Sequence, residues 1–254
     1  MIQIIGLQRI PIIKEHDDLV EIMLNSLKQM QLEVEHHDIF VIAHTIISRI
    51  EGRIQDLNQI TPTQEALQIA KSLNNSKDPR LITLILEESK SILRTAVING
   101  IGKIIVETKL GYICADAGID KSNTPNDLVT LLPLNPDKSA AEIRTQIFQK
   151  TGKDVAVIIS DTHGRPFRHG AINVAIGVAG IKEICDYRGR TDLFNYKLQK
   201  TQIAIADELA SAAELVMGEA DEGMPIILIR GYQYEDKDGK AQRLIRPAHQ
   251  DLFR

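Results

Sequence analysis

The chain has 254 residues, 43% of them hydrophobic and 25% charged, with a formal net charge of −4. This composition is typical of a soluble globular protein, and the small acidic charge does not indicate the basic surface that nucleic-acid binding requires. The two cysteines are too few for a disulfide framework. The sequence has no apolar run long enough to cross a bilayer, and its N-terminus lacks the features of a signal peptide. We therefore predict a cytoplasmic protein that binds neither membranes nor nucleic acid.

Strands are predicted where β-branched and apolar residues run together, and helices where apolar residues recur three and four positions apart. In the first half of the chain these patterns predict strands at residues 1–7, 38–47, 101–110 and 112–115, and helices at residues 19–30, 61–73 and 78–93. Thr61 is the expected N-cap of the second of these helices, with Pro62 at its first position.

The second half of the chain has the same irregular mixture of elements. It is predicted to contain helices at residues 139–150 and 202–217, strands at residues 155–160 and 224–230, and polar loops at residues 116–127, 161–170 and 218–223. Ser139 is the expected N-cap of the first helix, and Gly152 its end. Because strands and helices interleave irregularly, the predicted class is α+β, in one catalytic domain of residues 1–254 with room for two lobes. Neither a P-loop nor a dinucleotide-binding fingerprint is present, which excludes P-loop and Rossmann folds.

Three acidic segments lie next to apolar strands, at residues 117–123, 159–165 and 218–223. Carboxylate and hydroxyl oxygens beside glycines suit hard cations such as Mg²⁺ and Mn²⁺, which bridge a few carboxylates and a substrate phosphate. The alternative for each segment taken alone is an ordinary turn, because Asp, Asn and Gly favour turns.

Basic residues suggest where anions bind. Arg165, Arg168 and His169 follow Asp161 closely, as phosphate or carboxylate recognition would require, although a solvated basic loop has the same composition. Residues 11–14 and 44–53 are further candidate nucleotide contacts, because a strand that ends in hydroxyl and basic residues can hold phosphates.

Together these segments resemble the coenzyme F420-0:L-glutamate ligase family, the F420 gamma-glutamyl ligases. The matching segments are residues 11–19, 47–53, 117–123, 161–165 and 217–219. The resemblance runs from near residue 6 to about residue 231, and the order and spacing of its segments are more specific than any one motif. It implies an unusual α+β fold and an intertwined homodimer.

The resemblance also implies a reaction and a set of site residues. The family uses GTP and two divalent ions, Mg²⁺ or Mn²⁺, to add L-glutamate to F420-0 and then further γ-linked glutamates, and K⁺ is an additional candidate ion. Asp120 and Asp161 would bind one metal ion, and Thr162 and Glu219 the second. The implied GTP contacts are Pro11, Ile12, Ile13, Lys14, His44, Thr45, Arg49, Asn123, Met217, Gly218, Glu219, Ala220, Asp221, Glu222, Gly223 and Met224. The family often has Ser-Thr in place of His44-Thr45, and Lys in place of Arg49.

The expected mechanism is formation of an acyl phosphate on the acceptor, followed by attack of the glutamate amine. We predict from their charge that Arg165 or Arg168 holds the carboxylates of glutamate or F420-0. Two other functions fit the same residues: a metal-dependent phosphatase or phosphotransferase, and a non-catalytic regulator that binds a nucleotide or flavin.

Overall fold

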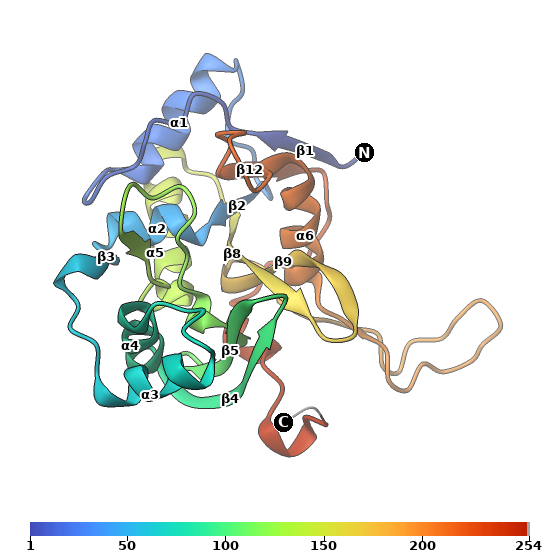
Figure 1. The fold of residues 1–254 in the computed structure, drawn as a ribbon. Helices are drawn as coiled ribbons and strands as arrows, with labels where there is room; N and C mark the ends of the chain where they lie inside the picture. The colour runs from blue at the N-terminus through green and yellow to red at the C-terminus, as the bar shows by residue number, and fades with distance from the viewer. Residues whose placement is uncertain (253–254) are drawn as a thin grey trace.

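A mixed five-stranded sheet forms the centre of the molecule (Figure 1), whose computed structural model describes residues 1–252. In spatial order its strands are β1 (Gln3–Gly6), β12 (Ile226–Arg230), β2 (Ile39–Ala43), β8 (Ala156–Arg165) and β9 (Arg168–Ala179). β2 and β8 are parallel, and all the other neighbouring pairs in this sheet are antiparallel. The predicted α+β class is therefore confirmed.

Helices cover both faces of the sheet because its central strands are apolar on both sides. On β2, Phe40 and Ile42 face a core that contains α1 (Leu19–Gln29), α2 (His44–Ile50) and α5 (Pro136–Thr151). Ile39 and Val41 face the opposite core, which contains α6 (Ile205–Met217). Successive residues of a strand point to opposite faces, so one short apolar strand contributes to two cores.

Residues 54–130 form a smaller group of elements. It contains α3 (Gln64–Ser72), α4 (Pro79–Glu87), the antiparallel strands β4 (Ser89–Ile98), β5 (Ile101–Thr108) and β6 (Ile113–Ala115), and the pair β3 (Ile54–Asp56) and β7 (Leu128–Thr130). Of these elements, α3, α4, β4 and β5 lie below the central sheet in Figure 1. The largest core of the group is built around Ile82, Ile85, Ile104 and Val106. This core is separate from the two that cover the central sheet.

Shorter elements complete the described chain. They are the 3₁₀ turns η1 (Leu57–Gln59), η2 (Asp116–Gly118), η3 (Ala241–Leu244) and η4 (Ala248–Gln250), and the two-residue strands β10 (Cys185–Asp186) and β11 (Gln202–Ile203). Residues 187–201, between β10 and β11, form a long loop that projects from the body of the molecule (Figure 1). Within residues 1–252, no helix has the length and apolar character needed to cross a membrane. One catalytic domain over residues 1–254 stays a prediction, and the last two residues lie outside the described part.

Three predicted elements are wrong in kind over part of their length. The strand expected at residues 38–47 ends at Ala43, and helix α2 begins at His44, because Ile46 and Ile47 become buried on a helix face. The helix expected to reach residue 93 ends at Glu87, and the following residues pair with β5 as strand β4. The polar loop expected at residues 161–170 is instead the turn of a β8–β9 hairpin, with both strands continuing into it. In all three cases tertiary contacts override the local pattern.

Three helices begin a few residues away from the start that the sequence predicts. Thr63, not Thr61, caps α3, and its hydroxyl accepts a hydrogen bond from the backbone N–H of Ala66. Asn135, not Ser139, caps α5, which has Pro136 in its first turn. Several neighbouring residues of good capping type compete at both sites, and the sequence alone cannot rank them. The helix expected from residue 202 begins at Ile205, after β11.

The packing of α5 on β9 allows a test of the fold at Gly177. A Cβ atom at Gly177 would lie 2.5 Å from the carbonyl oxygen of Pro136, so even alanine would force β9 and α5 apart. We expect Gly177→Ala to lower the free energy of unfolding by about 1–3 kcal/mol, measured by denaturant titration. Gly164→Ala is the matched control, because nothing lies within 4 Å of the corresponding Cβ position. Equal losses in the two variants would contradict this packing argument.

Candidate functional site

A cavity of about 980 Å³ opens where β2 ends and β8 passes beside it. Its volume is near the upper end of the range of about 300–1,000 Å³ that is typical of small-molecule sites. Its lining residues come from five stretches, residues 10–13, 43–49, 114–125, 160–164 and 217–225, and from Asn173. The fold therefore brings segments from most of the chain to one place.

The parallel pairing of β2 and β8 explains the position of this cavity. Ala43 lies opposite Ser160 in the register, so the next residues of the two strands, His44 and Asp161, meet at the carboxyl end of β2. The carboxyl ends of parallel strands are the usual place for ligand sites in open sheets. Nε2 of His44 lies 3.2 Å from Oδ1 of Asp161, and both side chains are almost fully buried.

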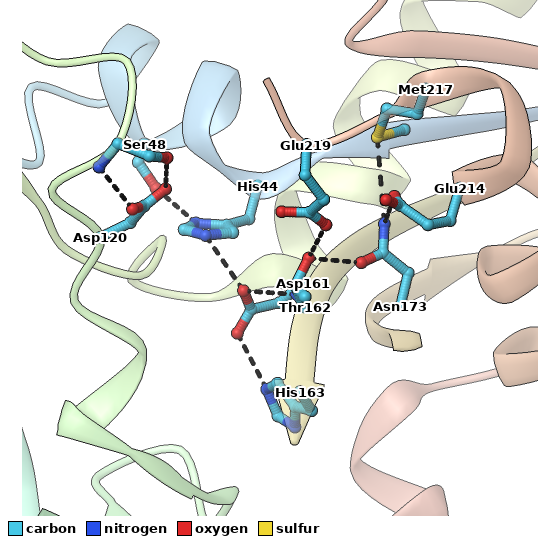
Figure 2. A network of polar contacts seen from close by, with 11 residues as sticks. His44, Ser48, Asp120, Asp161, Thr162, His163, Asn173, Glu214, Met217 and Glu219 are labelled. Carbon is cyan, nitrogen blue, oxygen red and sulfur yellow. Dashed lines mark hydrogen bonds and ion pairs between the residues drawn. The ribbon is translucent and has the colours of Figure 1, made fainter. Parts of the chain in front are cut away.

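Asp161 lies at the centre of a polar network (Figure 2). Its Oδ2 is 2.8 Å from Nε2 of His163, and its Oδ1 accepts a hydrogen bond of 2.8 Å from the backbone N–H of Thr162. Burial alone would raise the pKa of Asp161, but the charge of His44 and the hydrogen bonds from both histidines hold it well below its usual range. Burial likewise opposes the charged form of His44, yet the charge of Asp161, helped by Asp120 and Glu219, raises the pKa of His44 overall.

A second set of polar contacts surrounds Thr162. Its Oγ1 lies 2.6 Å from Oδ1 of Asn173 and also contacts Oε1 of Glu219. Nδ2 of Asn173 donates to Oε2 of Glu214 at 2.6 Å. Burial, followed by the hydrogen bond and charge of the nearby Glu219, raises the pKa of Glu214 to about 7. Carboxyl groups are therefore crowded at this end of the cavity.

Asp120 is positioned by a short bridge outside the named strands. Its backbone exchanges hydrogen bonds of 2.9 and 2.8 Å with the backbone of Thr130. Its carboxylate accepts two hydrogen bonds of 2.7 Å, from the N–H and the hydroxyl of Ser122. Nearby, the guanidinium of Arg49 donates to the carbonyl oxygen of Asn123. The loop that carries Asp120 is thereby held against α2.

The cavity collects nearly all the residues that the sequence indicated. Its lining includes the four predicted metal ligands Asp120, Asp161, Thr162 and Glu219, and the predicted GTP contacts Pro11, Ile12, Ile13, His44, Thr45, Arg49, Asn123 and residues 217–224. Lys14 is not part of the lining, and its backbone N–H donates to Asp17 at 2.7 Å. Arg165 and Arg168 lie at the turn of the β8–β9 hairpin, also outside the lining, where Arg165 donates to the carbonyl oxygen of His169 at 2.9 Å. The roles of all these residues stay predictions.

Sequence reasoning missed the roles of His163, Asn173 and Glu214 in this network. Asn173 could be found only by recognising β9, because it lies directly opposite Thr162 in the β8–β9 register. Glu214 precedes Gly218 by four positions, about one turn of α6, and that spacing is a signal that the sequence does contain.

The charge of the cavity lining is strongly negative. Its acidic side chains are Asp116, Asp120, Asp161, Glu219, Asp221 and Glu222. Within this lining, Arg49 is the one Lys or Arg side chain. Among residues 1–252, no three His, Cys, Asp or Glu side chains are grouped closely enough to hold a metal ion by themselves. An anionic ligand in this cavity would therefore need cations supplied from outside the protein.

Comparison with known proteins finds matches that together cover the whole chain. The family model described as F420-0:Gamma-glutamyl ligase matches residues 8–231. A protein of Methanothermobacter thermautotrophicus named coenzyme F420:L-glutamate ligase is 46% identical, over 100% of this chain and 99% of its own length. Proteins of the same name from Methanocaldococcus jannaschii and Archaeoglobus fulgidus are 46% and 36% identical, over 100% of this chain and 97% and 96% of their lengths.

These matches define the class of the protein first: it is an enzyme of the ligase class. More narrowly, the chain belongs to the F420-0:gamma-glutamyl ligase family.

The ion pair between His44 and Asp161 predicts a pH dependence in protein freed of metal by a chelator. Because the pKa of His44 is raised on folding, the pair stabilises fully below the ordinary value of 6.5 and loses this contribution as the pH rises through the raised value. The free energy of unfolding of the parent should therefore exceed that of His44→Gln most at low pH, by a margin that shrinks as the pH rises.

Denaturant titrations between about pH 5 and pH 8 measure this margin. The same comparison in an Asp161→Asn background is the control, and there the margin should no longer shrink with rising pH. A margin that is constant across this range in the parent background would refute the ion pair as a source of stability.

Proposed function

We propose that the protein uses GTP to join L-glutamate to coenzyme F420-0 through an amide bond and then adds further γ-linked glutamates. The observation that carries this proposal is the cavity, which is large enough for a nucleotide and is lined by six carboxylates from separate segments. The family membership and the names of the relatives support the substrates.

The acidic lining supports the use of divalent cations. A triphosphate would be repelled by these carboxylates unless cations lay between them, and Mg²⁺ is usually held by one or two carboxylates together with substrate phosphates and water. Asp120 and Asp161 would hold one Mg²⁺ or Mn²⁺, and Thr162 and Glu219 the other. The Thr162 hydroxyl has one hydrogen but contacts two acceptor oxygens, those of Asn173 and Glu219, so one of these contacts lacks a hydrogen. A cation between Thr162 and Glu219 would remove the repulsion between their oxygens, and these oxygen ligands therefore suit such ions. K⁺ remains a further candidate.

The residues around the acids suggest how GTP is held. Arg49 can offer its guanidinium to a phosphate, since its present partner is a backbone carbonyl oxygen. Ile12 is 80% exposed and lines the cavity beside Pro11, so it offers apolar surface to a purine base. Residues 217–224 supply backbone N–H groups around Gly218 and Gly223, both of which have positive φ angles of 68° and 67°. Positive φ angles are comfortable for glycine and let the backbone approach a ligand closely.

The proposed reaction has two steps. A carboxylate oxygen of F420-0 attacks the γ-phosphorus of GTP, GDP leaves, and an acyl phosphate forms. The amine of glutamate then attacks the acyl carbon, inorganic phosphate leaves, and the amine loses a proton as the amide forms. Bound cations supply charge neutralisation for the phosphoryl oxygens. Arg165 and Arg168, close to the cavity along the β8–β9 hairpin, remain our candidates for holding the carboxylates of glutamate or F420-0.

Replacing Asp161 with Asn tests this assignment. The variant keeps the size of the side chain but removes the charge at the centre of the network. Removing a group that only supports a metal ligand typically lowers metal affinity or activity by about 10–100-fold. Loss of a ligand itself should therefore lower the rate of GTP-dependent glutamate addition by about 100-fold or more. Product masses after incubation with F420-0, L-glutamate, GTP and Mn²⁺ give the rate.

Asp127→Asn is the matched control, because Asp127 lies outside the cavity lining and pairs with Lys121 at 3.8 Å. Near-parental activity of Asp161→Asn would show that the metal assignment is wrong. Phosphate release from GTP without any amine acceptor would instead favour the phosphatase or phosphotransferase, and GTP binding without turnover would favour the regulator.

We also propose that the protein forms a homodimer through residues 187–201. Leu193 and Phe194, in this projecting loop, are 97% and 89% exposed, and Tyr196 is 58% exposed. Such large apolar side chains at the end of a long loop are costly in water unless another surface covers them. A cytoplasmic location stays a prediction.

Replacing both Leu193 and Phe194 with Asp tests the dimer. The parent should have twice the chain mass by light scattering after gel filtration, and the double variant should have the mass of one chain, because charges replace the apolar contacts. Phe148→Asp is the control, since Phe148 is 49% exposed on α5, away from this loop. A dimeric double variant would exclude the loop as the interface.

A further inference from the structure

Asn173 is a buried polar side chain that lines the cavity and contacts Thr162, and no part in the reaction is assigned to it above. It is 2% exposed and lies on β9 directly opposite Thr162. Its backbone carbonyl accepts a hydrogen bond of 2.7 Å from the hydroxyl of Ser211 on α6. The residue thus joins β8, β9 and α6 at one point, with both ends of its amide committed to partners (Figure 2).

The amide of Asn173 has a defined direction. Nδ2 donates to Oε2 of Glu214 at 2.6 Å, so Oδ1 must face the hydroxyl of Thr162, which lies 2.6 Å away. An amide oxygen can only accept a hydrogen bond. The hydroxyl therefore has in Asn173 a fixed acceptor for its single hydrogen, separate from Glu219.

The direction of this hydrogen matters for a cation ligand. A hydroxyl binds a cation through an oxygen lone pair, and it cannot do so while its hydrogen points at the ion. If Thr162 gives its hydrogen to Asn173, its lone pairs point toward the oxygen of Glu219 that it already contacts. Two acceptor oxygens in contact repel each other unless a hydrogen or a cation lies between them, so this pair attracts a cation.

We infer that Asn173, oriented by Glu214, is a positioning residue that takes the hydrogen of Thr162 and so makes its hydroxyl a cation ligand together with Glu219. This inference rests on the proposed function, because it concerns the second of the two cation sites. Asn173 acts through Thr162 and does not touch the cation, and Glu214, which also interacts with Glu219, orients Asn173. Groups that orient metal ligands typically affect metal affinity by about 10–100-fold.

The test is a titration of the full-length protein with Mn²⁺ in the presence of GDP, with free Mn²⁺ followed by electron paramagnetic resonance. The parent should bind two ions. Asn173→Leu keeps the volume of the side chain but removes the acceptor. It should lower the affinity for one of the two Mn²⁺ ions by about 10–100-fold and leave the affinity for the other unchanged. Glu214→Gln keeps the shape but lets the amide of Asn173 turn round, and it should weaken the same ion; it also serves if Asn173→Leu does not fold.

Two controls separate positioning from a merely structural role. Ser211→Ala removes a hydrogen bond to the backbone carbonyl of Asn173 but leaves its amide contacts in place, and it should leave both Mn²⁺ affinities unchanged. Thr162→Val removes the hydroxyl, and the double variant Thr162→Val/Asn173→Leu should bind Mn²⁺ no more weakly than Thr162→Val alone.

Unchanged binding of both ions in Asn173→Leu, or in Glu214→Gln if the leucine variant does not fold, would overturn the inference. So would equal losses in Ser211→Ala and Asn173→Leu, or additive losses in the double variant. A parent protein that binds fewer than two ions would overturn the proposed pair of cation sites as well, whereas the preceding results would leave that pair standing.

Discussion

The candidate site depends on the parallel pairing of β2 with β8. This register places Ala43 opposite Ser160, and only then do the residues that follow bring an imidazole and a carboxylate into contact. A slip of one residue would turn Asp161 to the opposite face of the sheet. Asp161 would then point toward the core of α6 and lose its contact with His44, while His163, two residues further along the same strand, would turn with it. The same two strands supply apolar residues to the cores on both faces, so the stability of the sheet and the geometry of the site share one origin.

Negative charge connects the separate parts of the cavity. The carboxylates that line it come from segments far apart in the sequence, and the surrounding protein screens them less than water would. The pKa of Glu214 and the pKa of His44 are both raised, in part by the charge of Glu219. Two groups on different elements are therefore subject to the same negative electrostatic potential. That potential is what a site for cations and phosphates requires before its ligands arrive.

Local patterns were sufficient for most of the fold. Apolar runs and helical spacing correctly predicted β1, α1, β5 and β12, and the order of short motifs indicated the residues that line the cavity. Errors occurred where a choice depended on distant partners. Residues 44–47 are β-branched enough for a strand, but burial against α5 and the sheet makes them a helix. The β8–β9 hairpin was missed because its polar tip has the composition of a loop.

The part of the site that the sequence could not reveal follows from these errors. Without β9, Asn173 has no predicted relation to Thr162, although the two side chains lie side by side in the sheet. His163 was visible as part of a motif, but its partner was not, because Asp161 and His163 point to the same side only once β8 is known to continue. Contacts across strands depend on the register of strand pairing, which is difficult to predict from a single sequence.

The placement of β12 has a consequence for how the chain reaches this structure. β12 lies between β1 and β2, so these two strands, which are synthesised well before β12, have no direct contact with each other in the sheet. The backbone groups that β1 and β2 direct toward β12 can form hydrogen bonds only after residues 226–230 have been synthesised, and such pairings between distant segments slow folding. During synthesis the apolar edge of β2 is therefore exposed for most of translation, when chaperones or the early β2–β8 pairing would have to protect it.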